Sequence, residues 1–264
     1  MNILEEIRAF KVNEVKERKS LYPVKLLEKS IYFQPEAVSL KTYLQRPDLP
    51  GVIAEFKRKS PSKGVINGYA DPKTICLGYM QAGASALSVL TDSEYFGGSA
   101  EDLKTARKFN YCPILRKDFI VDEYQIIEAR SFGADVVLLI AEILDEGQVK
   151  ALSQQAKGLG LEVLLEVHSE AEIAKWNDNI DLIGINNRNL KTFEVHIDKS
   201  VELLEKLPQG VMKIAESGIR DEKTVVQLKN AGFDGFLIGE LFMSQPDPAA
   251  FCSKFIQNIQ TQLA

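Results

Sequence analysis

Eight short apolar segments recur at roughly regular intervals, and this rhythm limits what the chain can fold into more than any other feature of its sequence. The segments are rich in β-branched residues or leucine, as buried strands usually are. They occupy residues 51–57, 86–91, 113–119, 136–141, 162–168, 182–188, 213–218 and 235–242. The sequence therefore predicts eight strands.

Stretches with helical periodicity lie between these segments. Two of them, residues 71–83 and 122–134, carry a glycine near their ends, where a helix C-cap favours one. Alternating strands and helices indicate parallel pairing through crossovers, and near-continuous apolar strands indicate burial on both faces. Eight such units predict a closed TIM (β/α)8 barrel. An open doubly wound sheet is the alternative, but the nearest glycine pair, Gly158 and Gly160, precedes a strand instead of following one.

Residues 1–48 precede the first predicted strand. The pattern predicts one or two helices there, over residues 2–20 and 22–33. The chain has 264 residues, of which 45% are hydrophobic and 26% charged, which is typical of a globular protein. Because 48 residues are too few for a core of their own, we expect an N-terminal helical extension (1–48) on a single catalytic barrel domain (49–264).

Composition excludes several functional classes. A net charge of −5 without clustered basic residues argues against nucleic acid as a partner. The N-terminus lacks the apolar core of a signal peptide, and the longest apolar run, "VVLLIA", is too short to cross a bilayer. Three widely spaced cysteines favour a reducing compartment. His168 and His196 lack metal-site spacing, so we expect ordinary polar side chains, no bound metal and a cytoplasmic location.

Polar residues share one face of five predicted strands. Side chains alternate between the two faces of a strand, so Glu55 and Lys57 point the same way. Each of the other four strands carries a polar residue near its carboxyl end, on the corresponding face. The late ends of barrel strands meet at one rim, where such enzymes carry their active sites. A single charged side chain at a strand end often simply extends into water. Burying several charged side chains without a function would cost much free energy. The pattern thus predicts one site containing Glu55, Lys57, Lys117, Glu166, Asn186, Arg188 and Glu216.

Three further segments suggest a phosphate site. "ESGI" (216–219) and "IGE" (238–240) follow the seventh and eighth predicted strands, where barrels often present backbone N–H groups to a phosphate. Gly218 and Gly239 would let the ligand approach the backbone, although each alone is also compatible with a plain turn. The first loop adds Lys59 as a point charge and Ser60 as a hydrogen-bond donor.

Seven motifs in this order and spacing resemble the indole-3-glycerol phosphate synthases of tryptophan biosynthesis. They are "IAEFKRKSPSKG", "SVLTDSEYFGGS", "PILRKDFIVDEYQI", "LEVHSEAE", "IGINNRNLKTF", "IAESGI" and "FLIGELFM". The resemblance covers essentially the whole chain. It implies a carboxy-lyase that closes the ring of 1-(2-carboxyphenylamino)-1-deoxyribulose 5-phosphate, releasing carbon dioxide and water. It also implies no metal or organic cofactor, a phosphorylated small molecule as the partner, and a monomer.

The resemblance further implies roles for the catalytic residues. Lys117 would protonate the substrate carbonyl, and Lys57 would pair with the substrate carboxylate while Glu55 orients that lysine and takes part in proton transfer. Glu166 would be the acid or base of the dehydration half. Asn186 and Glu216, together with Ser217, would position substrate hydroxyl and amine groups.

The remaining roles implied by the resemblance concern the phosphate end. Arg188 would lie at the rim. Glu240 stands where some relatives have a small hydroxyl residue, so its side chain would have to point away. The phosphate would be held by Lys59, Ser60, Gly218, Leu237, Gly239 and Glu240 or their backbone N–H groups.

The chemistry independently requires such residues. Ring closure develops negative charge on a carbonyl oxygen, which a cation stabilises and an acid quenches, and the later loss of a proton and water needs a base and an acid. Three alternatives stay open. A sugar-phosphate isomerase would need a Cys/Asp pair, and no cysteine ends a predicted strand at the rim. A Schiff-base aldolase would use Lys117 or Lys57 as its nucleophile. A metabolite-binding subunit would bind without turnover.

Overall fold

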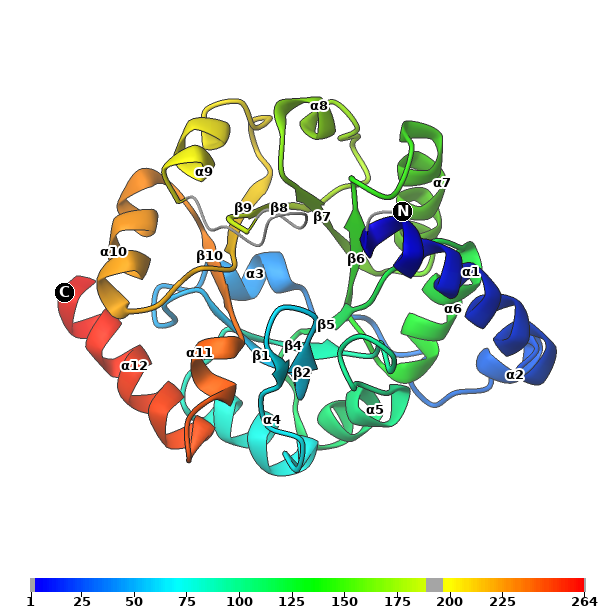
Figure 1. The fold of residues 1–264 in the computed structure, drawn as a ribbon, viewed down its shortest axis with the longest axis horizontal. Helices are drawn as coiled ribbons and strands as arrows, with labels where there is room; N and C mark the ends of the chain where they lie inside the picture. Colours follow the sequence, from blue (N-terminus) through cyan, green and yellow to red (C-terminus); the bar gives the residue numbers. More distant parts are fainter. Residues whose placement is uncertain (1–2, 189–196, 264) are drawn as a thin grey trace.

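Eight parallel strands close into a barrel in the computed structural model, which describes residues 3–188 and 197–263 (Figure 1). The strand order around the barrel is β1-β10-β9-β8-β7-β6-β5-β4, so each strand pairs with its neighbour in sequence and the last closes on the first. The predicted TIM barrel is therefore confirmed. The strands are β1 (Val52–Phe56), β4 (Ala86–Leu90), β5 (Ile114–Lys117), β6 (Val136–Ile140), β7 (Glu162–Val167), β8 (Leu182–Asn186), β9 (Met212–Glu216) and β10 (Gly235–Ile238).

Helices surround the strands, and local sequence explains where many of them begin and end (Figure 1). The side chains of Asp71, Asp122, Asp145 and Asp221 each accept a hydrogen bond from a backbone N–H in the first helical turn. Gly133 ends one helix in the left-handed conformation, with a φ of 90°. The helices are α4 (Pro72–Gln81), α5 (Ala100–Phe109), α6 (Glu123–Phe132), α7 (Glu146–Gly158), α8 (Glu170–Ile173), α9 (Ile197–Leu204), α10 (Glu222–Ala231), α11 (Glu240–Met243) and α12 (Pro248–Leu263).

Three helices precede the barrel: α1 (Ile3–Leu21), α2 (Val24–Leu27) and α3 (Leu40–Leu44). The second predicted helix, over residues 22–33, is thus much shorter than expected, and α3 was not predicted. Ser39 starts α3 by accepting a hydrogen bond from the backbone N–H of Thr42. Leu4 and Ile7 of α1, together with Leu40 and Leu44 of α3, are buried in the same apolar core as the strands. Burial of each such side chain contributes about 1.5–3 kcal/mol.

Two loops differ from the predicted strand pattern. The predicted strand over residues 235–242 ends at Ile238, because Gly239 is the N-cap of α11. The loop after β1 contains a small antiparallel pair, β2 (Lys59–Ser60) and β3 (Gly64–Val65). His196 lies outside the described residues. Within residues 3–188 and 197–263, no helix combines the length and apolarity needed to span a membrane.

Candidate active site

A cavity of about 570 Å³ lies at the carboxyl ends of the barrel strands. Its size suits a small-molecule substrate. Of the fourteen predicted site residues, all except Lys59 line it. Those that do are Glu55, Lys57, Ser60, Lys117, Glu166, Asn186, Arg188, Glu216, Ser217, Gly218, Leu237, Gly239 and Glu240.

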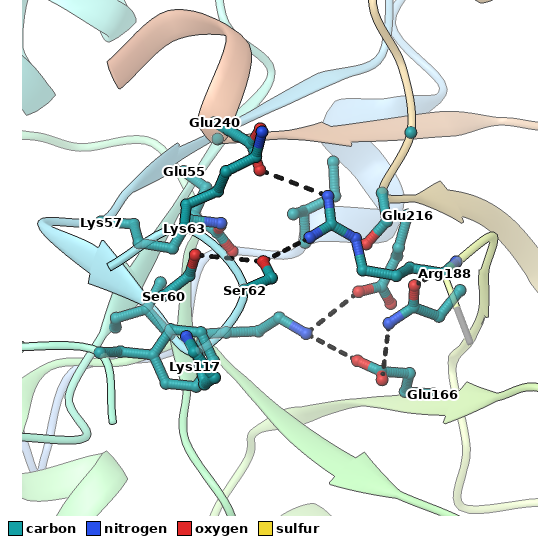
Figure 2. A pocket seen from close by; sticks show the side chains of 18 of the residues that line it. Glu55, Lys57, Ser60, Ser62, Lys63, Lys117, Glu166, Arg188, Glu216 and Glu240 are labelled. Atoms are coloured by element: carbon teal, nitrogen blue, oxygen red, sulfur yellow. Dashed lines mark hydrogen bonds and ion pairs between the residues drawn. The ribbon is translucent and has the colours of Figure 1, made fainter. Parts of the chain in front are cut away.

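Lys117 lies between two buried carboxylates (Figure 2). Its Nζ is 2.7 Å from Oε2 of Glu166 and 3.1 Å from Oε2 of Glu216. Burial lowers the pKa of Lys117, but attraction to Glu166, Glu216 and Glu55 outweighs it, so the pKa is raised above the usual value. The ammonium is therefore held in its protonated, acidic form.

The two carboxylates beside Lys117 differ in their affinity for a proton. The pKa of Glu216 is raised to about 7. Burial is the largest cause, and repulsion from Glu166 and Glu55 adds to it, whereas attraction to Lys117 opposes both. Burial also raises the pKa of Glu166, but Lys117, His168 and a 3.0 Å hydrogen bond from Asn186 outweigh it and lower the net pKa. Glu216 thus holds a proton more readily than its neighbour. One site therefore contains both an ionised carboxylate and one that titrates near neutral pH.

Glycines make room for the acidic side chains. A Cβ on Gly184 would clash with Oε1 of Glu216, and one on Gly239 would clash with Oε1 of Glu55. Glu55 is buried, and its Oε1 lies 2.7 Å from Nζ of Lys57. Position 239 therefore requires glycine because the Glu55 side chain packs closely against it, in addition to any approach by a ligand.

Cationic and hydroxyl groups gather at the other end of the cavity. Arg188 donates through Nη1 to Oγ of Ser62 at 2.7 Å, and its Nη2 lies 3.3 Å from Oε2 of Glu240 (Figure 2). Nζ of Lys63 is 3.7 Å from Oε1 of Glu240. Ser217, after β9, has a φ of 63°, which is strained backbone for a residue other than glycine. Because lysine and arginine stand beside the carboxylates, this set suits an anionic substrate better than a metal ion.

The structure does not bring Lys59 to the cavity. Its ammonium donates to the carbonyl oxygen of Glu94, in the loop after β4. Lys59 and Ser60 are neighbours in β2 and point to opposite sides, so that only Ser60 faces the cavity. Lys63, four residues later, lines the cavity instead. The sequence interpretation missed Lys63 because this residue lies in the turn between β2 and β3, where no strand periodicity fixes the direction of a side chain.

Part of the cavity wall is apolar and comes from α1. Ile3, Leu4 and Ile7 line it, together with aromatic and aliphatic side chains of the barrel such as Phe119 and Ile140. No site residue was predicted in this helix, because strand parity says nothing about a segment that precedes the barrel. Its amphipathic pattern alone indicates a buried face but not what that face covers.

Comparisons with known proteins show the family to which this chain belongs. The family model described as "Indole-3-glycerol phosphate synthase" matches residues 4–255. The indole-3-glycerol phosphate synthase of Bacteroides thetaiotaomicron is 49% identical over 259 residues, covering 98% of this chain and 99% of the relative. That of Campylobacter fetus is 43% identical over 244 residues, covering 92% and 95%.

A solved structure supports the fold alone. The crystal structure of 3-hexulose-6-phosphate synthase from Salmonella typhimurium has a TM-score of 0.64 at 15% sequence identity, covering 80% of this chain and 99% of that one. At this identity the likeness carries only the barrel architecture. The match of the family model over nearly the whole chain is specific, and this chain belongs to the indole-3-glycerol phosphate synthase family.

Proposed function

We propose that this protein converts 1-(2-carboxyphenylamino)-1-deoxyribulose 5-phosphate to indole-3-glycerol phosphate, carbon dioxide and water. The observation that carries this proposal is the position of Lys117 between Glu166 and Glu216, in a cavity that also contains Lys57 and Arg188. This arrangement supplies a cationic acid, a carboxylate base and separate cations for a carboxylate and a phosphate.

In the first half of the reaction, Lys57 pairs with the substrate carboxylate, and Glu55 orients that lysine through their 2.7 Å ion pair. Lys117 donates a proton to the carbonyl oxygen as the carboxylate-bearing aromatic carbon attacks the carbonyl carbon. The bond to the carboxylate then breaks, carbon dioxide leaves, and its electron pair restores the aromatic ring. The cation stabilises the oxyanion as it forms, which is the main contribution expected of such a group.

In the second half, the new hydroxyl leaves as water. Glu166 serves as the acid or base of this dehydration, since it contacts Lys117 on one side and Asn186 on the other. Glu216 and Ser217, with Asn186, position the amine and hydroxyl groups. Loss of a proton from the carbon next to the nitrogen completes the indole ring.

The phosphate is proposed to bind at the opposite end of the cavity, among Arg188, Ser60 and the backbone near Gly218, Leu237 and Gly239. Lys63 takes the place proposed for Lys59. The carboxylate of Glu240 contacts Arg188 and Lys63. It must turn away for a phosphate to reach the same cations, because like charges repel at this distance.

The alternatives have less support. Cys76, Cys112 and Cys252 are buried, and none of the three lines the cavity, so a Cys/Asp isomerase pair is not formed there. The raised pKa of Lys117 makes its amine a poor nucleophile for a Schiff base. The three reduced thiols are consistent with a cytoplasmic location, which we propose together with a monomeric state.

A direct assay tests the proposed reaction. Purified protein is mixed with the carboxyphenylamino-deoxyribulose phosphate in the presence of chelator, and the growth of indole fluorescence is followed. We expect growth with wild type and none with Lys117→Met. Borohydride added with substrate should trap no covalent adduct. Binding of substrate without fluorescence growth would favour a metabolite-binding subunit, and a trapped adduct would favour the aldolase.

A further inference from the structure

His168 lies directly behind Glu166 but is not among the described residues that line the cavity. It follows the last residue of β7, and its Nε2 is 3.7 Å from Oε1 of Glu166. The side chain of His168 is 13% exposed, whereas that of Glu166 is 3% exposed. The His168 side chain is therefore more exposed to solvent than the carboxylate beside it.

The other ring nitrogen faces two more carboxylates. Nδ1 of His168 is 3.5 Å from Oε2 of Glu172, on α8, and 4.0 Å from Oε2 of Glu142, in the loop after β6. Glu172 is fixed in place because it accepts hydrogen bonds from the backbone N–H of His168 and the hydroxyl of Ser169, at 2.8 and 2.9 Å. The side chains of Glu142 and Glu172 are 20% and 15% exposed, so both reach water.

These neighbours control the charge of the ring. Burial lowers the pKa of His168, but the nearby carboxylates of Glu172, Glu166 and Glu142 outweigh this effect, and the pKa is raised. Two cations flank the group without contacting the ring. Lys117 lies on the far side of Glu166. Lys175 donates to the carbonyl oxygens of Ala141 and Leu144, on either side of Glu142.

The proposed reaction requires a proton from solution in each cycle. Two protons enter, one on the carbonyl oxygen and one on the departing hydroxyl, and one leaves from the carbon next to the nitrogen. The ionised substrate carboxylate departs as neutral carbon dioxide, so one proton per turnover is taken up and the charges balance. Both Lys117 and Glu166 are largely buried, so this proton needs a path to them.

We propose that His168 is this path: it accepts a proton at Nδ1 from the side of Glu142 and Glu172 and delivers one at Nε2 to Glu166. The inference rests on the proposed function. An imidazole can bind one proton and release another from its opposite nitrogen, which makes it suited to a relay. The 3.7 Å separation must shorten when substrate binds, as contacts in an empty catalytic site often do. Since His168 acts through Glu166, it is a positioning residue and not a catalytic one.

The test is single-turnover kinetics of His168→Gln, with chelator present. Glutamine keeps a polar side chain of similar length but cannot relay a proton. We expect the rate of indole formation to fall at least ~10-fold, the low end for loss of one proton-transfer group, with the affinity for substrate changed less than about twofold. Glu170→Gln, two residues away on the exposed side of α8, is the matched control and should leave the rate unchanged.

Chemical rescue separates a relay from a structural role. Added imidazole should restore much of the lost rate of His168→Ala, which leaves space for the ring, in a saturable way, and it should not restore Lys117→Met. Unchanged single-turnover rates, or a loss that imidazole does not restore while the variant remains folded, would overturn the relay. His168→Asn serves as the second variant should His168→Gln fail to fold.

Measuring proton uptake together with indole formation distinguishes a failure of the relay from a failure of the proposed function. A pH-indicator dye in weak buffer should record one proton consumed per indole formed by wild type. Absence of indole formation by wild type would reject the proposed function itself. Indole formation by wild type that His168→Gln reproduces at full rate would reject only the relay.

Discussion

Lys11 and Asp118 form a buried ion pair, with 2.9 Å between Nζ and Oδ1. Asp118 directly follows Lys117, so α1 is attached to the strand end that carries the proposed acid. Nζ of Lys11 is also 2.8 Å from Oδ2 of Asp92, after β4. The lysine is 1% exposed. Helix α1, which precedes the barrel, is thus attached to the catalytic rim of the barrel through one buried ammonium group.

Replacing Lys11 with methionine should therefore destabilise the protein. The change leaves the buried Asp92 carboxylate without the ammonium of Lys11 and leaves Asp118 paired with Arg116 alone, which costs about 3–5 kcal/mol of the free energy of unfolding. We also expect a higher KM, because Ile3, Leu4 and Ile7 of the same helix line the cavity. Urea denaturation and steady-state kinetics measure the two effects.

The control for this prediction is Lys19→Met. Lys19 lies on the same helix and pairs with Asp122, but both side chains are more than a third exposed. Exposed pairs contribute up to about 1 kcal/mol, so this variant should be almost as stable as wild type. Equal losses in the two variants would contradict the role given to Lys11.

Lys117→Met should lower kcat by at least ~10², the lower end for loss of one general acid, while the fold stays intact. Steady-state assays with circular dichroism check both points. Lys206→Met is the matched control, because the exposed Lys206 pairs with Glu170 away from the cavity and should keep wild-type turnover. A Lys117→Met enzyme within a few-fold of wild type would remove Lys117 from the acid role.

Glu216 should make stability depend on pH in a defined direction. Its pKa is raised from 4.5 to about 7, so between these values the folded state binds a proton that the unfolded state has released. The free energy of unfolding must then fall as pH rises through this window. Glu216→Gln removes this contribution. Urea denaturation at pH 5 and pH 8 should show a larger loss in wild type than in the variant, and equal losses would contradict the raised pKa.

Gly184→Ala should lower activity without any new charge. The added Cβ would overlap Oε1 of Glu216 and lie 3.0 Å from its Cδ, so the carboxylate must leave its present position beside Lys117. We expect kcat to fall by at least ~10-fold, as misplacement of a catalytic group commonly causes. Gly158→Ala on α7 is the control, because its added Cβ meets nothing within 4 Å. If both variants kept full activity, the close packing of Glu216 would have no catalytic role.

The sequence by itself determined the barrel and much of its site. Eight apolar segments were confirmed as eight strands, and the alternation of side chains along them predicted that Glu55, Lys117, Glu166 and Glu216 share one rim. Both inferences work because strand periodicity fixes the direction of a side chain from its position alone. No contact between distant residues has to be known.

Only the tertiary structure decided which residues complete the site. It excluded Lys59 from the cavity and included Lys63, identified Ile3, Leu4 and Ile7 as the residues of α1 that line the cavity, and placed His168 against Glu166. Each depends on how a loop or helix packs against a distant segment, and the spacing of residues along the chain contains no such information. The charge states follow the same rule, because the proton affinity of Glu216 is set by burial and by neighbours that are brought together only when the barrel closes.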